Sequence, residues 1–219
     1  MADFINVIEV FYSFQGESTL VGRPTIFIRT ARCNLSCITC DTKYSLKNGS
    51  RIKIKDLLRA IEPFKTEFVC ITGGEPLLQR TSVKRLIKQL LRINKKISIE
   101  TNGAVPIKGL DKKVKKIVDV KTPSSKQVNS FLLENLKHLN KNDEIKFLVS
   151  NRRDFDFYMD FIARHRIKNS VLLSPNLAVK GLANKLASWI LKEKVKAIFQ
   201  PQLHKLVKEK PVYILKYRT

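Results

Sequence analysis

The sequence predicts an α/β protein in which parallel strands form an incomplete barrel. Short runs of β-branched and apolar residues alternate with longer amphipathic stretches, a pattern typical of parallel strands joined by right-handed crossovers. Six or seven such units are fewer than the eight of a complete β/α barrel, and 219 residues suit the smaller fold. We see no linker, repeat or low-complexity tract, so we expect residues 1–219 to form one domain.

The apolar runs predict seven strands, and the amphipathic stretches predict five helices. The predicted strands are Thr25–Thr30, Phe68–Thr72, Ile97–Thr101, Ile117–Lys121, Glu144–Val149, Ser170–Ser174 and Lys196–Gln200. The predicted helices are Lys55–Ile61, Ser82–Ile93, Lys126–Leu139, Asp154–Arg166 and Ala183–Lys192. Leu132, Leu136 and Leu139, for example, recur at the spacing of one helix face.

Chemically distinctive residues come directly after most of the predicted strands. In chain order these segments are Cys33–Cys40, Gly73–Pro76, Glu100–Gly103, Lys121–Ser124, Ser174–Asn176 and Gln200–His204. The carboxyl ends of parallel strands share one face of a barrel, and active sites form on that face. We therefore expect these segments to meet at one mouth.

The composition is strongly basic, with 42 Lys and Arg against 19 Asp and Glu, a formal net charge of +23. The lysines are spread along the chain without the interleaved aromatic residues of many RNA-binding modules, which favours solvated helix faces over a nucleic-acid partner. A basic surface could still attract an acidic electron donor or anionic substrates. The sequence has no export signal near Met1 and no run of about 18 apolar residues, so we expect a cytoplasmic protein without a membrane partner.

Three of the four cysteines, Cys33, Cys37 and Cys40, lie within eight residues. Three thiolates are one short of the four that fully ligate a [4Fe–4S] cube, which leaves one iron with an open position. A structural zinc usually needs four protein ligands, and the chain has no second cysteine pair. We therefore interpret these three cysteines as the ligands of a catalytic cluster. Cys70 lies in an apolar run and is predicted to be a buried free thiol.

The spacing Cys-x3-Cys-x2-Cys after the first predicted strand resembles the signature of the radical S-adenosylmethionine (SAM) superfamily, and Gly73–Pro76 resembles its second motif, which contacts the SAM methionine. Further segments, in this order, resemble the 7-carboxy-7-deazaguanine synthase family over about Val10–Lys205. They are Phe14–Glu17, Phe27–Arg29, Cys40–Thr42, Glu100–Gly103, Lys121–Lys126 and Pro201–Lys205. The resemblance therefore implies an incomplete barrel of the radical SAM type.

The resemblance also implies that the protein is an enzyme, a carbon–nitrogen lyase that acts in the biosynthesis of the deazapurine tRNA bases queuosine or archaeosine. Such an enzyme converts 6-carboxy-5,6,7,8-tetrahydropterin to 7-carboxy-7-deazaguanine with loss of ammonia. The implied cofactors are a [4Fe–4S] cluster, SAM and Mg²⁺. The implied partners are the pterin substrate, a flavodoxin or ferredoxin electron donor and a second copy of the chain.

The resemblance assigns roles to individual residues. The cluster ligands are Cys33, Cys37 and Cys40, and the Mg²⁺ ligand is Thr42. The SAM contacts are Thr39, Cys40, Asp41, Gly74, Glu75, Glu100, Lys121, Ser174 and Asn176. The substrate contacts are Phe14, Gln15, Gly16, Glu17, Arg29, Thr72 and His204.

Some roles follow from side-chain chemistry, and some remain open. Gln15 can pair with the amide edge of a pterin, Glu17 can accept from its ring amino group, and Arg29 can hold its carboxylate. A surface ion pair for Arg29 and a plain surface histidine at His204 remain alternatives. Asp119-Val120-Lys121 stands where relatives carry Ser-Pro-Lys, and Ser18 replaces a glycine. The first difference leaves the SAM contacts at that strand open. The basic tail, Lys205 to Thr219, leaves open how the C-terminus closes the pocket.

Two other functions compete with this one. A glycyl-radical activating enzyme shares the cysteine spacing and a small barrel but needs no pterin pocket, and the segments Gln15–Glu17 and Cys40–Thr42 argue against it. A basic RNA-binding protein with a structural metal is the second alternative.

Overall fold

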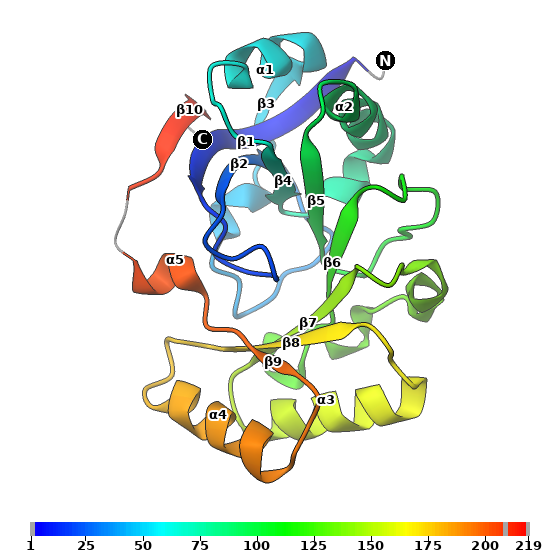
Figure 1. Cartoon of the computed structure of the whole chain (residues 1–219), viewed down its shortest axis with the longest axis vertical. Coiled ribbons are helices and arrows are strands. Elements are labelled where there is room, and N and C mark those ends of the chain that lie inside the picture. The colour runs from blue at the N-terminus through cyan, green and yellow to red at the C-terminus, as the bar shows by residue number, and fades with distance from the viewer. Residues whose placement is uncertain (1–2, 208–209, 218–219) are drawn as a thin grey trace.

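The computed structural model describes residues 3–207 and 210–217. Within them, one curved sheet of ten strands follows the order β10-β1-β2-β4-β5-β6-β7-β8-β9, with β3 paired to β1 (Figure 1). Seven parallel strands make up most of it: β2 (Pro24–Thr30), β4 (Phe68–Gly73), β5 (Lys96–Thr101), β6 (Lys115–Asp119), β7 (Glu144–Val149), β8 (Ser170–Pro175) and β9 (Ile198–Phe199). In the described residues β9 and β10 do not pair, so the barrel is incomplete, as predicted.

Three antiparallel strands at one side of the sheet were not predicted from the sequence. These are β1 (Phe4–Phe14), β3 (Ser50–Lys53) and β10 (Val212–Lys216), and β1 pairs with β2, β3 and β10. Polar residues interrupt the apolar run of β1, so the sequence pattern did not mark it as a strand. One of them, Glu9, is 5% exposed because Arg29 and Tyr44 pair with its carboxylate.

Four of the five predicted helices are present, within two residues of the predicted bounds, and they cover the outer side of the sheet (Figure 1). They are α1 (Ile54–Ile61), α2 (Arg80–Arg92), α3 (Arg152–His165) and α4 (Leu182–Lys192), and a short helix α5 (Leu203–Leu206) follows β9. Leu86 and Leu90 of α2 are fully buried and join the larger of two apolar clusters. No helix in the described part of the chain is both long and apolar enough to cross a membrane.

The predicted helix Lys126–Leu139 is wrong. The segment instead forms two short 3-10 turns, Val128–Ser130 and Leu133–His138, and a third, Pro123–Ser125, precedes it. Asn135 explains the difference, because its buried side chain accepts a hydrogen bond from Ile107 N and donates to the carbonyls of Gly103 and Val105. Side chains that bond to backbone in this way compete with helix formation.

The pleat of the sheet decides which side chains enter the barrel. Ile28, Ile71 and Ile99 point outward into the larger apolar cluster, while the residues that follow each of them line the interior. Successive side chains of a strand point to opposite faces, so one register fixes the whole interior set. That set includes Arg29, Thr72, Glu100, Asp119 and Lys146.

The loop between β1 and β2 closes the gap between the ends of the sheet. Ser18 N donates to Gln200 Oε1 at 2.7 Å, and Gln200 Nε2 donates back to Ser18 O at 2.6 Å. Leu203 N donates to Gly16 O at 2.9 Å. These bonds join the first hairpin to the segment after β9, so residues 15–18 form part of the barrel wall.

Candidate active site

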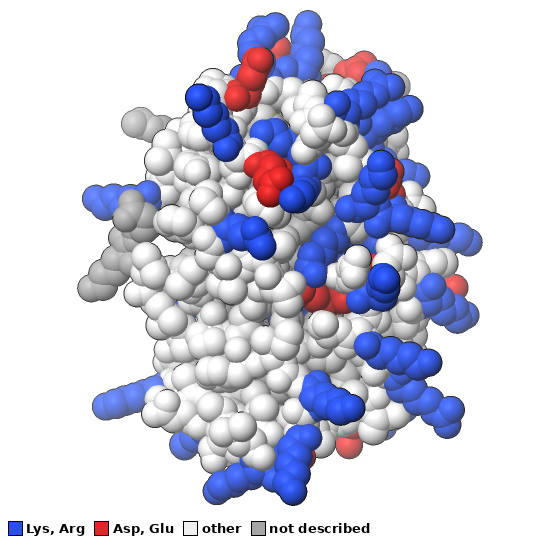
Figure 2. All heavy atoms as spheres, viewed as in Figure 1, with Lys and Arg blue, Asp and Glu red and all other residues white. Residues whose placement is uncertain are grey.

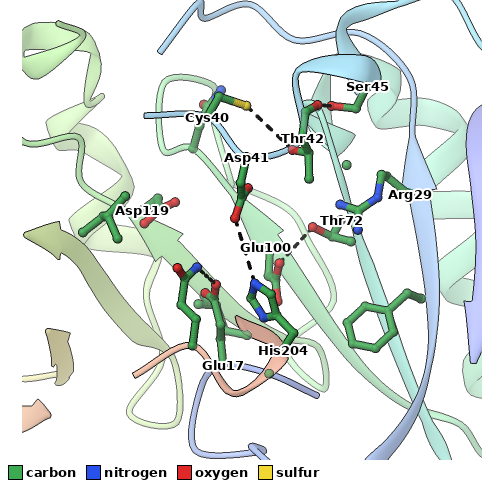
Figure 3. A pocket seen from close by; sticks show the side chains of 18 of the residues that line it. Glu17, Arg29, Cys40, Asp41, Thr42, Ser45, Thr72, Glu100, Asp119 and His204 are labelled. Atoms are coloured by element: carbon green, nitrogen blue, oxygen red, sulfur yellow. Dashed lines mark hydrogen bonds and ion pairs between the residues drawn. The ribbon is translucent and has the colours of Figure 1, made fainter. Parts of the chain in front are cut away.

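A cavity of about 530 Å³ opens at the carboxyl ends of the parallel strands, where the sequence predicts the active site. Figure 3 shows its labelled side chains converging from the strands, the cysteine loop and the C-terminal segment. The predicted site residues on its wall are Phe14, Gln15, Gly16, Glu17, Arg29, Cys33, Cys37, Thr39, Cys40, Asp41, Thr42, Thr72, Gly74, Glu100, Lys121 and His204. The predicted residues Glu75, Ser174 and Asn176 do not line it.

The three clustered cysteines lie half-buried on one part of this wall, in the loop that follows β2. Burial raises the pKa of the Cys33 and Cys37 thiols, and Lys121 counteracts this at both. In the described residues no three His, Cys, Asp or Glu side chains converge on a single metal ion. Cys70 is buried in β4 and donates to Glu100. Three thiols without a fourth protein ligand fit a [4Fe–4S] cluster with one open iron better than a structural zinc.

The two glycines after β4 hold this loop against the sheet. A Cβ added to Gly74 would lie 1.9 Å from Arg32 O, and one added to Gly73 would lie 2.3 Å from Thr30 O. Glu75 N donates to Arg32 O at 2.8 Å, just before the first cysteine. The backbone therefore approaches so closely here that only glycine fits.

Glu75 fastens the glycine turn to the end of β5 and is fully buried. Its carboxylate accepts hydrogen bonds from Leu77 N, Thr101 Oγ1 and Asn102 N, at 2.7–2.9 Å. Burial raises its pKa despite these bonds. Two other predicted SAM contacts also lie off the cavity wall: Ser174 is buried, with no partner for its hydroxyl among the described residues, and Asn176 donates to Ser150 Oγ.

The floor of the cavity carries the residues predicted to hold the pterin. Gln15 Nε2 lies 3.5 Å from Glu100 Oε1, and Thr72 Oγ1 donates to Glu100 Oε2 at 2.8 Å. Burial and the nearby Glu17 carboxylate raise the pKa of Glu100. Glu100 was predicted to lie at SAM, but the structure places it among the predicted pterin contacts.

Lys146 joins this floor to the neighbouring part of the wall. Its ammonium group pairs with Glu17 Oε2 and lies 3.7 Å from Asp119 Oδ2, which in turn pairs with Lys121 Nζ at 2.9 Å. Gln202 Nε2 donates to the other Glu17 oxygen at 2.5 Å. Burial opposes charge on Lys146, yet the surrounding carboxylates outweigh it and raise its pKa.

Arg29 lies on the interior face of β2 among aromatic rings. Its Nε donates to Glu9 Oε1 at 2.8 Å, and its guanidinium lies 5.4 Å from the Phe11 ring centre. Tyr44 donates to the same Glu9 oxygen at 2.9 Å, and burial raises the Tyr44 pKa to about 12. Arg29 therefore does form an ion pair, but the pair is largely buried on the cavity wall and does not lie on the surface.

The C-terminal segment forms the side of the cavity opposite the sheet. His204 Nε2 lies 3.9 Å from Asp41 Oδ2, and Lys205 Nζ lies 3.1 Å from the same oxygen (Figure 3). A Cβ at Gly16 would lie 2.3 Å from His204 Nδ1, so glycine there admits the imidazole. Thr42 lies beside the last cysteine, with 3.7 Å between its Oγ1 and Cys40 Sγ.

Sequence reasoning missed several residues on the cavity wall. Asn102 donates to Asn34 Oδ1 at 2.8 Å and lies 3.5 Å from Cys33 Sγ, and it belongs to a segment already singled out. Gln202 lies in the recognised Pro201–Lys205 segment. Lys146 and Tyr44 carry no local signal, because a lone lysine in a strand and a lone tyrosine in a loop are ordinary surface residues.

Comparison with known proteins agrees with this geometry. Residues 27–174 match the family model of the radical SAM superfamily, so fold and site define a radical SAM protein. The 7-carboxy-7-deazaguanine synthase of Methanospirillum hungatei JF-1 is 39% identical over 203 residues, 93% of this chain and 85% of the relative. That of Koribacter versatilis is 34% identical over 218 residues, 93% and 96% of the two chains. This chain belongs to the 7-carboxy-7-deazaguanine synthase family.

The fold has a solved counterpart. The crystal structure of QueE from Escherichia coli matches with a TM-score of 0.74, covering 90% of this chain and 94% of that one at 23% sequence identity. At this identity the likeness concerns the fold, which is the partial barrel predicted from the sequence.

Proposed function

We propose that this protein is a radical SAM lyase that converts 6-carboxy-5,6,7,8-tetrahydropterin to 7-carboxy-7-deazaguanine with loss of ammonia, a step toward deazapurine tRNA bases. The observation that carries the proposal is one cavity with two different ends. The cysteine loop forms one end, and Gln15, Glu17, Arg29 and Thr72 form the other. Membership of the synthase family supports the same reaction and disfavours the glycyl-radical and RNA-binding alternatives.

In this proposal the chain's residues divide the cavity between cofactor and substrate. Cys33, Cys37 and Cys40 would hold the [4Fe–4S] cluster, and Thr39, Asp41, Gly74 and Lys121 would contact SAM beside it. Once held there and reduced, such a cluster would supply the electron for the reductive cleavage of SAM, the source of the radical that would take hydrogen from the pterin. Glu75 supports this region from behind the wall.

The floor residues would orient the pterin so that its C6 faces the cofactor end. Gln15 pairs with the amide edge, Glu17 accepts from the ring amino group, and Thr72 and Phe14 contact the ring. Arg29 has N–H groups besides the one bound to Glu9, and these would hold the carboxylate. We place Glu100 with this group because it contacts Gln15 and Thr72.

The requirement for Mg²⁺ is part of the proposal, with Thr42 as the protein ligand. Its hydroxyl lies on the cavity wall between the cysteine loop and the pterin end. Mg²⁺ keeps several waters and binds through few protein oxygens plus substrate oxygens, which suits one hydroxyl beside a substrate carboxylate.

The partners and setting are also proposed. Arg32 and Lys43 are exposed on or beside the cysteine loop, as is Ile38, which is 59% exposed. Lys126 is exposed next to Ser125, whose carbonyl accepts a hydrogen bond from Ile38 N at 3.1 Å. A basic rim of this kind suits an acidic flavodoxin or ferredoxin. Figure 2 shows basic side chains scattered along the top, the right side and the lower edge of one face, around a largely uncharged centre, unlike a single nucleic-acid stripe. We further propose one domain over residues 1–219, a homodimer, and work in the cytoplasm, where free thiols persist.

Anaerobic turnover tests the function. Reconstituted, reduced protein with SAM and 6-carboxy-5,6,7,8-tetrahydropterin is expected to form 7-carboxy-7-deazaguanine, faster with Mg²⁺ than without it. Iron and sulfide analysis accompanies the assay, and a Cys37→Ala variant serves as the control without turnover. SAM cleavage without the deazaguanine would contradict the proposed reaction, and a zinc-containing protein that takes up no iron would contradict the radical chemistry.

A further inference from the structure

Lys146 is a largely buried cation of the cavity that no predicted role accounts for. It is the third residue of β7, and its side chain is 12% exposed on the interior face of the barrel. Three carboxylates surround its ammonium group: Glu17 in direct contact, Asp119 at 3.7 Å, and Glu100 farther along the floor. A buried ammonium group is unfavourable unless it is paired, so its position is set by these acids.

The contacts of Glu17 explain what the lysine can do. One Glu17 oxygen accepts from Lys146 and the other from Gln202, while Glu17 N donates to Gln15 Oε1 at 3.1 Å. The carboxylate is therefore fixed between two donors beside the side chain proposed for the amide edge of the ring. An ionised carboxylate only accepts hydrogen bonds, whereas a protonated one also donates.

We propose that Lys146 is a positioning residue for the pterin, which holds the Glu17 carboxylate aimed at the amino group of the ring. The inference rests on the proposed function and deepens it, because it identifies how this chain prepares its acceptor before substrate arrives. The second contact, with Asp119, ties the pterin end of the cavity to Lys121 at the cofactor end.

Charged groups from several elements share the cavity with Glu17. β7 contributes Lys146, β6 and the residues after it contribute Asp119 and Lys121, β5 contributes Glu100, the cysteine loop contributes Asp41, and the C-terminal segment contributes His204 and Lys205. Without Lys146, the Glu17 carboxylate would keep the neutral Gln202 as its side-chain donor. The oxygen that Lys146 now binds would lose its donor and face the like charge of Glu100 without compensation.

The test compares Lys146→Met with Lys146→Arg and with a matched control, Lys116→Met. Lys116 also forms a buried ion pair, 2.9 Å from Asp143 Oδ2, but neither residue lines the cavity. Binding of 6-carboxy-5,6,7,8-tetrahydropterin to the SAM-loaded protein is measured by anaerobic calorimetry at pH 7, with kcat and KM measured in parallel.

We expect Lys146→Met to weaken pterin binding at pH 7 by about tenfold or more, the scale of a lost hydrogen bond to a charged group. KM should rise more than kcat falls, because the lysine acts on substrate position. Lys146→Arg should keep most of the affinity, and SAM binding should stay unchanged. Lys116→Met should lower stability without a change in pterin affinity.

A double variant isolates the path through Glu17. In a Glu17→Gln background the carboxylate that Lys146 holds is absent, so Lys146→Met should add little further loss of affinity. The proposal is overturned if Lys146→Met binds the pterin like wild type, or if its loss of affinity persists in full in the Glu17→Gln background. If wild-type protein binds the pterin but forms no deazaguanine, the reaction is wrong while this inference stands on the binding data alone.

Discussion

Gly74→Ala tests whether the glycine turn exists to hold the cysteine loop. Gly74 has an ordinary backbone conformation, with no positive φ, so an alanine there would by itself stabilise the chain by about 0.4–1 kcal/mol through the unfolded state. The structure predicts the opposite sign. The new Cβ would lie 1.9 Å from Arg32 O and 2.5 Å from Arg32 C, and both are backbone atoms that no rotamer change can move.

The magnitude follows from two contributions. Forcing an extra methyl group into a closely packed contact costs about 1–3 kcal/mol. Displacing the turn also weakens the hydrogen bond from Glu75 N to Arg32 O, which is 2.8 Å long, and this costs about another 1 kcal/mol. After the gain through the unfolded state is subtracted from these two costs, we expect the free energy of unfolding to fall by about 1–3 kcal/mol.

Urea denaturation of the reduced apoprotein under anaerobic conditions measures this loss, and iron content after reconstitution measures the effect on the cysteine loop. Gly22→Ala is the control, because no atom lies within 4 Å of its added Cβ and only its φ of +81° is unfavourable. It should take up iron normally. A Gly74→Ala protein at least as stable as wild type with full iron content would refute the reasoning.

Three further predictions concern other residues. Burial raises the pKa of Glu75 in the folded state, so folding favours its protonated form. The stability of wild type relative to Glu75→Gln should therefore fall as pH rises from about 4.5, the ordinary pKa of a glutamate. Urea denaturation from pH 4 to 8 measures both proteins, and the same dependence of stability on pH in both would contradict this prediction. Asn135→Ala should cost about 3 kcal/mol, because three buried backbone bonds lose their partner, whereas the exposed Asn129→Ala should change stability little in the same denaturation assay. Thr42→Ala should raise the Mg²⁺ concentration for half-maximal turnover about tenfold or more, and Thr42→Ser should not; the same Mg²⁺ dependence in both variants would remove Thr42 as the ligand.

The parallel part of the fold could be predicted because its signals are local. Each interior strand is a short run of β-branched residues, and Leu86 and Leu90 mark a helix face by their spacing. The helix predicted over Lys126–Leu139 had the same spacing and was wrong. Asn135 bonds to a loop 28–32 residues earlier, a contact that no local pattern contains.

The sequence by itself determined the chemistry at the cysteine end. Three thiols in eight residues and a glycine turn are local motifs, and their positions after strands indicated one mouth. Their close contact, through Gly74 and Arg32, adds a reason for the glycines but does not change the prediction.

Only the tertiary structure decided the floor of the cavity. Lys146 stands between Ile145 and Phe147, so alternation alone shows that it faces away from the outer core, which could equally mean solvent. The register that pairs it with Asp119, and the hairpin loop that brings Glu17 from 129 residues away, turn that face into a buried site. A side chain's face is a local property of its strand, but what covers that face depends on segments distant in the chain.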